Sequence, residues 1–202
     1  MSISRLEPAL FESIQHNSLI PSSSLNLQGK KMTDTDVEHI AHALLINTTL
    51  ITLHLGHNNI TAIGAQHIAH ALLTNNTLTI LDLRYNQITD TGARALFQTL
   101  TPGAVTYGTT PNKTNTSLTH LNLSNNSITD SGAQAVLAAI HVNDSLLEVN
   151  LNNNHDVTDP SLTAIETATK KNGHNKKQRD SSLQQLLWTV HSQKILSELP
   201  ES

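Results

Sequence analysis

Imidazole, carboxylate and hydroxyl side chains recur in the middle of this sequence. His54, His57, Asp82 and His120 are of the residue types that bind Zn²⁺. Ser124 follows His120 closely, so a serine, a histidine and an acid are also present for nucleophilic chemistry. Either chemistry requires the fold to bring these side chains together, so the elements that position them decide what they can do.

A repeating pattern of aliphatic residues predicts those elements. Each unit opens with two aliphatic residues separated by one residue: Leu25 and Leu27, Leu53 and Leu55, Leu81 and Leu83, Leu121 and Leu123, and Val149 and Leu151. The steps between pairs are 28, 28, 40 and 28 residues, so the third unit carries 12 extra residues near 101–112. Self-similarity at this period predicts stacked supersecondary units that bury a common core.

Each unit is predicted to be a strand, a turn and a helix. The alternating leucines are typical of a short strand with one buried face, and apolar residues at a period of 3.6 follow as a helix. An asparagine after each strand predicts a ladder of side-chain amides under the turns (Asn58, Asn86, Asn126 and Asn154). A second asparagine after each helix predicts a left-handed C-cap (Asn47, Asn75, Asn115, Asn143 and Asn172). Because strands stack ~4.8 Å apart and helices need ~10 Å, the array must curve with its strands inside.

The L-x-L-x-x-N-x-I cores, with Gly-Ala pairs at Gly64-Ala65, Gly92-Ala93 and Gly132-Ala133, resemble the leucine-rich repeat family, specifically its ribonuclease-inhibitor-like class. The resemblance implies an α/β solenoid with parallel strands on the concave face, helices on the convex face, about five repeats and helical caps. It also implies a protein-binding role. We expect an N-terminal cap (1–21), repeats over 22–172 (22–49, 50–77, 78–117, 118–145 and 146–172), a basic linker (173–180) and a C-terminal capping helix and tail (181–202). The alternative for the last helix is a partner-docking amphipathic helix.

Inward-facing strand positions supply the candidate binding residues. Arg84 and Tyr85 lie at the centre of the predicted concave face, and interface hot spots favour these residue types. The candidate partner-binding residues are His54, His57, Asp82, Arg84, Tyr85, His120 and Asn122, together with Tyr107 in the insertion. The alternatives are a solvated polar sheet face and an insertion without a role.

Catalysis is not favoured by this arrangement. Neighbouring columns on a sheet diverge, so nothing enforces tetrahedral metal geometry, and Ser124 lacks a strained elbow or an oxyanion hole. We therefore expect no enzyme activity and no cofactor. A metal-dependent enzyme using the histidines and Asp82 remains one alternative hypothesis.

Composition restricts the remaining function classes. The chain has no cysteine, which excludes disulfide scaffolds and catalytic-cysteine ligases of this family. No signal peptide or apolar span is evident, so we expect a soluble, cytoplasmic monomer without membrane contact. These features are similar to those of small leucine-rich repeat effectors that intracellular bacterial pathogens deliver into host cells without a cleaved signal peptide.

The formal net charge is −4, but residues 170–179 hold five basic residues and no acidic ones. Overall acidity and the lack of interleaved aromatics in this segment argue against a nucleic-acid partner. Nucleic-acid or phosphate binding through 170–179 is the second alternative to protein binding.

Overall fold

Five short parallel strands and five helices alternate along the chain in this computed structural model, which describes residues 23–102 and 114–197. The strands are β1 (Ser24–Asn26), β2 (Thr52–His54), β3 (Ile80–Asp82), β4 (His120–Asn122) and β5 (Glu148–Asn150). The helices are α2 (Asp34–Leu44), α3 (Ala62–Leu72), α4 (Asp90–Gln98), α5 (Asp130–Val142) and α6 (Asp159–Ser197). The predicted N-terminal cap and Tyr107 lie outside the described residues.

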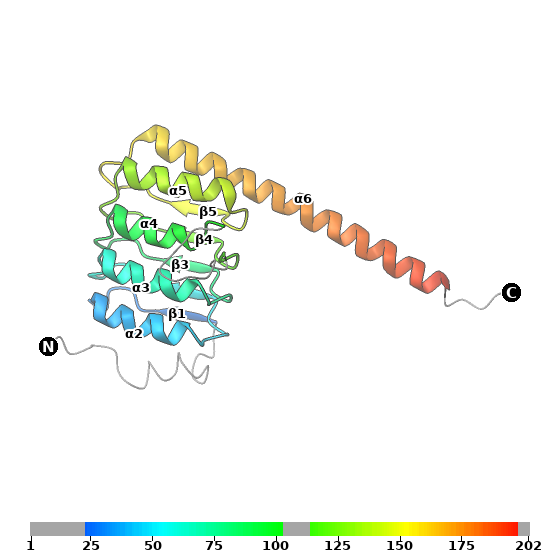
Figure 1. Cartoon of the computed structure of the whole chain (residues 1–202), viewed down its shortest axis with the longest axis horizontal. Helices are drawn as coiled ribbons and strands as arrows, with labels where there is room; N and C mark the ends of the chain where they lie inside the picture. The colour runs from blue at the N-terminus through cyan, green and yellow to red at the C-terminus, as the bar shows by residue number, and fades with distance from the viewer. Residues whose placement is uncertain (1–22, 103–113, 198–202) are drawn as a thin grey trace.

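The strands form one sheet in chain order, β1-β2-β3-β4-β5, and the helices stack side by side along one face of it (Figure 1). The register pairs Leu53 with Leu81 and Leu81 with Leu121, so the extra residues of the third unit do not shift the sheet. The predicted α/β solenoid is therefore confirmed. No helix in the described part of the chain is long and apolar enough to cross a membrane.

The core lies between the sheet and the helices. The aliphatic residue at the centre of each strand and the leucine just after the strand belong to this core, and Leu53, Leu55, Leu81 and Leu83 are fully buried. Burial of one such side chain contributes about 2 kcal/mol, and each unit shares its apolar face with its neighbours.

The predicted amide ladder under the turns is confirmed. The Asn86 side chain accepts a hydrogen bond from the Ile60 amide at 3.0 Å and donates to the carbonyls of Leu55 and Leu83 at 3.0 and 2.9 Å. Equivalent bonds form at Asn58, Asn126 and Asn154. Each asparagine thus links two successive units through groups that would otherwise be buried without partners.

The asparagines after the helices form a second ladder instead of left-handed caps, so that prediction is wrong. None of them has a positive φ, and Asn143 has φ −105°. The Asn75 side chain accepts from the amides of Thr77 and Leu78 and donates to the carbonyls of Leu44 and Asn47 in the preceding unit. The amide group satisfies four backbone groups this way, which a left-handed backbone would not achieve.

A third set of contacts joins the helix starts. Asp34 accepts hydrogen bonds from the amide and hydroxyl of Thr61 in the next unit, at 2.8 and 2.6 Å, and from the Gly64 amide at 2.9 Å. A Cβ on Gly64 would lie 2.5 Å from this carboxylate, so the glycine makes room for it. Asp90 and Asp130 bind Thr129 and Thr158 in the same way.

The C-terminal region differs from the expected linker followed by a separate capping helix. One helix runs from Asp159 to Ser197, and its second half extends away from the solenoid (Figure 1). Residues 173–180 contain one glycine, no proline and several good helix formers, so nothing in them ends the helix. Asn172 lies inside α6, where its side chain donates to carbonyls of the preceding unit.

Candidate protein-binding face

The strand register places the predicted residues in columns on the concave face. Asp82 lies opposite His54 on β2 and Asn122 on β4, while His120 lies opposite Ile80. The parallel register follows from the repeat alignment, because equivalent positions of stacked units must coincide.

Asp82 is the centre of a charged cluster. Its buried carboxylate lies 3.6 Å from His54 Nδ1 and 3.3 Å from Arg84 Nε, and it accepts a hydrogen bond from the Arg84 amide at 3.1 Å. The Arg84 guanidinium also donates to Gln28 on the first unit at 3.2 Å. A Cβ on Gly56 would come within 3.1 Å of Arg84 Cγ, so this glycine lets the arginine lie flat along the sheet.

The Arg84 Nε atom is buried and has no hydrogen-bond partner among the described residues. The contact with Asp82 is therefore an electrostatic approach without hydrogen-bond geometry. The Arg84 side chain as a whole is 39% exposed, so it remains accessible to a partner.

The second feature of the concave face is a pair of stacked rings, those of His57 and Tyr85. Their rings stack with centroids 4.1 Å apart and an angle of 13° between planes. Both residues have left-handed backbones, with φ 55° and 53°, and Tyr85 is 47% exposed. The equivalent residues in the other units, which also have positive φ, are Gly29, Asn125 and Asn153. Glycine and asparagine adopt this conformation readily, whereas tyrosine rarely does.

The left-handed position was missed by sequence reasoning. A signal was present, because glycine and asparagine occupy three of the five aligned positions. Only His57 and Tyr85 depart from residues that suit the backbone, and these two are in contact.

Two other predicted residues have local partners. His120 Nδ1 lies 2.7 Å from the Thr119 hydroxyl, and its Nε2 lies 3.9 Å from Glu148. Asn122 accepts a hydrogen bond from the Ser124 amide at 3.0 Å, and the same turn is formed at Asn26, Asp82 and Asn150. This contact gives Asn122 a structural role. His54, Asp82, His120 and Glu148 line a shallow hollow of about 250 Å³ between them.

Metal binding and nucleophilic catalysis find little support in the geometry of the described residues. Among residues 23–102 and 114–185, whose side chains the structure describes, no three His, Cys, Asp or Glu side chains are placed to hold a metal ion. Ser124 is buried, so its hydroxyl is not presented as a nucleophile.

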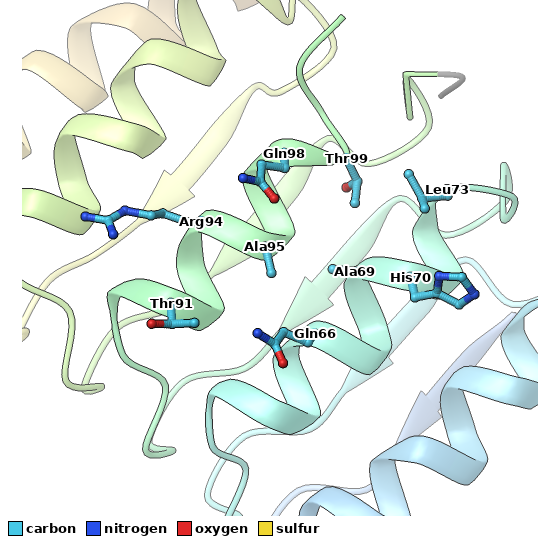
Figure 2. A pocket seen from close by; sticks show the side chains of 9 residues that line it. All are labelled: Gln66, Ala69, His70, Leu73, Thr91, Arg94, Ala95, Gln98 and Thr99. Atoms are coloured by element: carbon cyan, nitrogen blue, oxygen red, sulfur yellow. The ribbon is translucent and has the colours of Figure 1, made fainter. Parts of the chain in front are cut away.

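A groove on the convex side was not predicted. It lies between α3 and α4, has a volume of about 410 Å³ and is shown in Figure 2. The small side chains of Ala69 and Ala95 face it from the two helices, and Arg94 lies at its edge, where it donates to Ser131. Two small side chains on neighbouring helices leave this space. Ala69 and Ala95 occupy different positions of the repeat, so the repeat alignment did not indicate the groove.

Comparison with known proteins supports the fold. A family model described as Leucine Rich repeat matches residues 47–69, 74–97 and 114–137. A solved structure described as leiomodin-1 actin-binding site 2 is similar, with a TM-score of 0.74 and 20% identity over 88% of this chain and 95% of that one. The tropomodulin C-terminal domain of Caenorhabditis elegans gives a TM-score of 0.68 and 14% identity over 86% of this chain and 97% of that one.

No curated protein matches the sequence significantly. The repeat pattern, the amide ladders and the structural neighbours together show that the chain is a leucine-rich-repeat solenoid of the α/β class.

Proposed function

We propose that this chain is a non-catalytic module that binds a protein partner through the concave face of its solenoid. The observation that carries the proposal is the exposed Tyr85 stacked on His57 beside Arg84, at the central repeats. Tyrosine and arginine are the residues that most often dominate protein interfaces.

The backbone conformation supports a binding role for this pair. A residue other than glycine, asparagine or aspartate in the left-handed region costs about 1 kcal/mol, and the aligned positions show that the fold accepts asparagine there. A tyrosine at such a position adds strain that the solenoid does not need. Strained residues persist where function requires them.

The structural neighbours are consistent with a protein ligand. The leiomodin-1 structure is described as an actin-binding site, so a solenoid of this architecture serves protein binding in that case. For this chain we propose the same class of ligand, a protein, and extend the contact surface to the 101–112 insertion with Tyr107.

The basic segment supports a second candidate, nucleic-acid or phosphate binding. Residues 170–179 lie on α6 where it leaves the solenoid, and Lys171 and Lys177 are exposed. However, Lys170 pairs with Glu166, and Arg179 pairs with Asp144. Retention on immobilised RNA or DNA at low salt would favour this candidate, and its absence would end it.

We also propose that the protein acts inside a host cell after bacterial secretion. This proposal rests on the resemblance of its sequence to small leucine-rich repeat effectors of intracellular bacterial pathogens. A fusion to a calmodulin-dependent adenylate cyclase reporter tests this. Cyclic AMP in infected host cells supports delivery, and a signal no higher than in a secretion-deficient strain contradicts it.

The concave-face proposal is tested by partner capture. The double variant Arg84→Ala and Tyr85→Ala should lose the partners that the wild-type protein captures from lysate, at least tenfold by quantitative mass spectrometry. Ile63→Ala is the matched control, because Ile63 is 57% exposed on the convex helix α3. Equal capture by the double variant, with its fold intact by circular dichroism, would show that the concave centre is not the binding site.

A further inference from the structure

In the part of the chain that the structure describes, the sheet ends at β5 with a set of unpaired backbone groups. At the preceding junction, the Thr119 carbonyl accepts from the amides of Leu147 and Glu148, while Leu123 and Asn125 donate to Asn150 and Asn152. These bonds are 2.8–3.1 Å long and are repeated at each earlier junction.

One unit later, the equivalent groups are the Leu147 carbonyl and the amides of Leu151 and Asn153. None of the three has a hydrogen-bond partner within residues 23–102 and 114–197. The three groups are one acceptor and two donors. They lie at the positions through which each inner strand of this sheet pairs with the parallel strand that follows it. An edge of this kind is a template for an added strand.

The helix start at this end shows the same incompleteness. Asp34, Asp90 and Asp130 each accept hydrogen bonds from a threonine in the next unit. Asp159 is the aligned residue of the last unit, and no described unit follows to donate to it. Val149 is 8% exposed, whereas the aligned Leu121 is 1% exposed, so the core also opens at this end.

A hollow of about 760 Å³ lies between β5 and the first part of α6. Its apolar lining includes Val149, Leu162 and Ile165, which would receive apolar side chains from an added strand. Its charged lining consists of Glu148, Asp159, Glu166 and Lys170, and the lysine pairs with Glu166. The rim is therefore acidic and favours a basic ligand.

We propose that this open end binds an extended peptide segment of a protein partner, which adds to β5 as a parallel sixth strand. The segment carries apolar residues at alternate positions and at least one lysine or arginine near the acidic rim. This surface is separate from the Arg84–Tyr85 centre and does not depend on it.

A symmetric pair of copies fits the open end less well than such a peptide. A two-fold axis would place two β5 edges antiparallel, whereas the unpaired groups are spaced for a parallel neighbour. It would also bring Glu148 and Glu166 of both copies face to face, and like charges across an interface disfavour binding.

The probe for the test is a synthetic peptide with the sequence of residues 117–126, SLTHLNLSNN, followed by two lysines, since this segment already pairs in parallel within the sheet. Titration into the ¹⁵N-labelled full chain should shift the amide resonances of Leu151 and Asn153 and slow their hydrogen exchange. No saturable shift at either amide would overturn the proposal.

Peptide N-methylation tests the strand pairing itself. In the intact sheet, the amides of Thr119 and His120 donate to the preceding strand, whereas that of Leu123 donates to the following one. Methylating the peptide amides that correspond to Thr119 and His120 should weaken binding at least tenfold. Methylating the amide that corresponds to Leu123 should leave the affinity unchanged. Equal effects of the two modifications would contradict parallel strand addition.

Protein variants test the acidic rim and separate the two surfaces. The variant Glu148→Lys should weaken peptide binding at least tenfold, while Glu38→Lys on α2, which changes the net charge by the same amount, serves as the charge-matched control. The Arg84→Ala and Tyr85→Ala variant should bind the peptide like the wild type, so failure of one proposal leaves the other testable. Concentration-dependent dimers with Leu151 protected without peptide would show that a second copy occupies this end, and would refute the peptide proposal.

Discussion

Replacing His57 and Tyr85 together with asparagine should stabilise the solenoid while removing its binding centre. Asparagine occupies the aligned left-handed positions at Asn125 and Asn153, so the substitution introduces no new backbone requirement. The change removes two side chains that are disfavoured in this conformation.

The magnitude follows from two opposing terms. Relief of the left-handed conformation contributes about 1 kcal/mol at each position, or about 2 kcal/mol in total. Loss of the stacked pair, whose rings are 4.1 Å apart and whose Tyr85 is about half exposed, costs about 1 kcal/mol. The net prediction is a gain of about 1 kcal/mol, which corresponds to a rise of about 3 °C in Tm for a chain of this size.

Urea unfolding followed by circular dichroism measures this change, with the wild-type protein and Asn153→Tyr as references. The control places tyrosine at an aligned left-handed position whose neighbour in the preceding unit is Asn125 rather than an aromatic residue, so it should destabilise the fold by about 1 kcal/mol. A double asparagine variant that is destabilised by 1 kcal/mol or more would refute the reasoning, since the stacked pair would then be part of what holds the fold together.

Three further predictions concern the contacts between units. Asn86→Ala should destabilise the fold by about 3 kcal/mol in urea unfolding, because the buried Ile60 amide loses its acceptor; a loss below 1 kcal/mol would contradict the ladder's role. Ala62 is the first residue of α3, at the position where α2, α4 and α5 have Asp34, Asp90 and Asp130. Ala62→Asp should therefore stabilise the fold by about 1 kcal/mol in the same assay; no gain would show that this position differs from the aligned aspartates. Hydrogen bonds from Thr158 and Ser161 lower the pKa of the Asp130 carboxyl from its ordinary value of 3.8. Because the folded pKa is depressed, this contribution is present above pH 3.8 and is lost as the pH falls through the folded pKa; carboxyl NMR should show a titration midpoint below 3.8, and Asp130→Asn should reduce the acid dependence of stability.

The architecture was predictable because each unit repeats the same physical requirements. Leu53, Leu81 and Leu121 share one register, so alignment of the sequence with itself gives the alignment of the sheet. The amide ladder at Asn86 followed from the same logic, since an aligned polar residue in a buried turn needs a partner in the next unit.

The errors arose where one residue type satisfies two different requirements. Asparagine suits both a left-handed cap and a side-chain bridge, and the sequence around Asn75 does not distinguish them. The continuous helix α6 has a different cause: the polar, basic composition of residues 173–180 is typical of a linker, but these residues also have enough helix propensity to continue a helix.

The candidate site was predictable in part. Arg84 and Tyr85 were placed at the centre of the concave face by the repeat alignment alone. The stacking of His57 on Tyr85 and the approach of Arg84 to Asp82 depend on backbone angles and rotamers, which periodicity does not encode.

Site-specific photocrosslinking tests the central claim most directly. A benzoylphenylalanine residue is placed at Tyr85 in one protein and at Ile63 on the convex face in another, and both are irradiated in the same lysate. We predict that the variant labelled at position 85 forms a discrete crosslink to a protein partner, that the variant labelled at position 63 does not, and that Arg84→Ala abolishes the crosslink. The same partner crosslinked equally from both positions, or only from position 63, would contradict binding through the concave face.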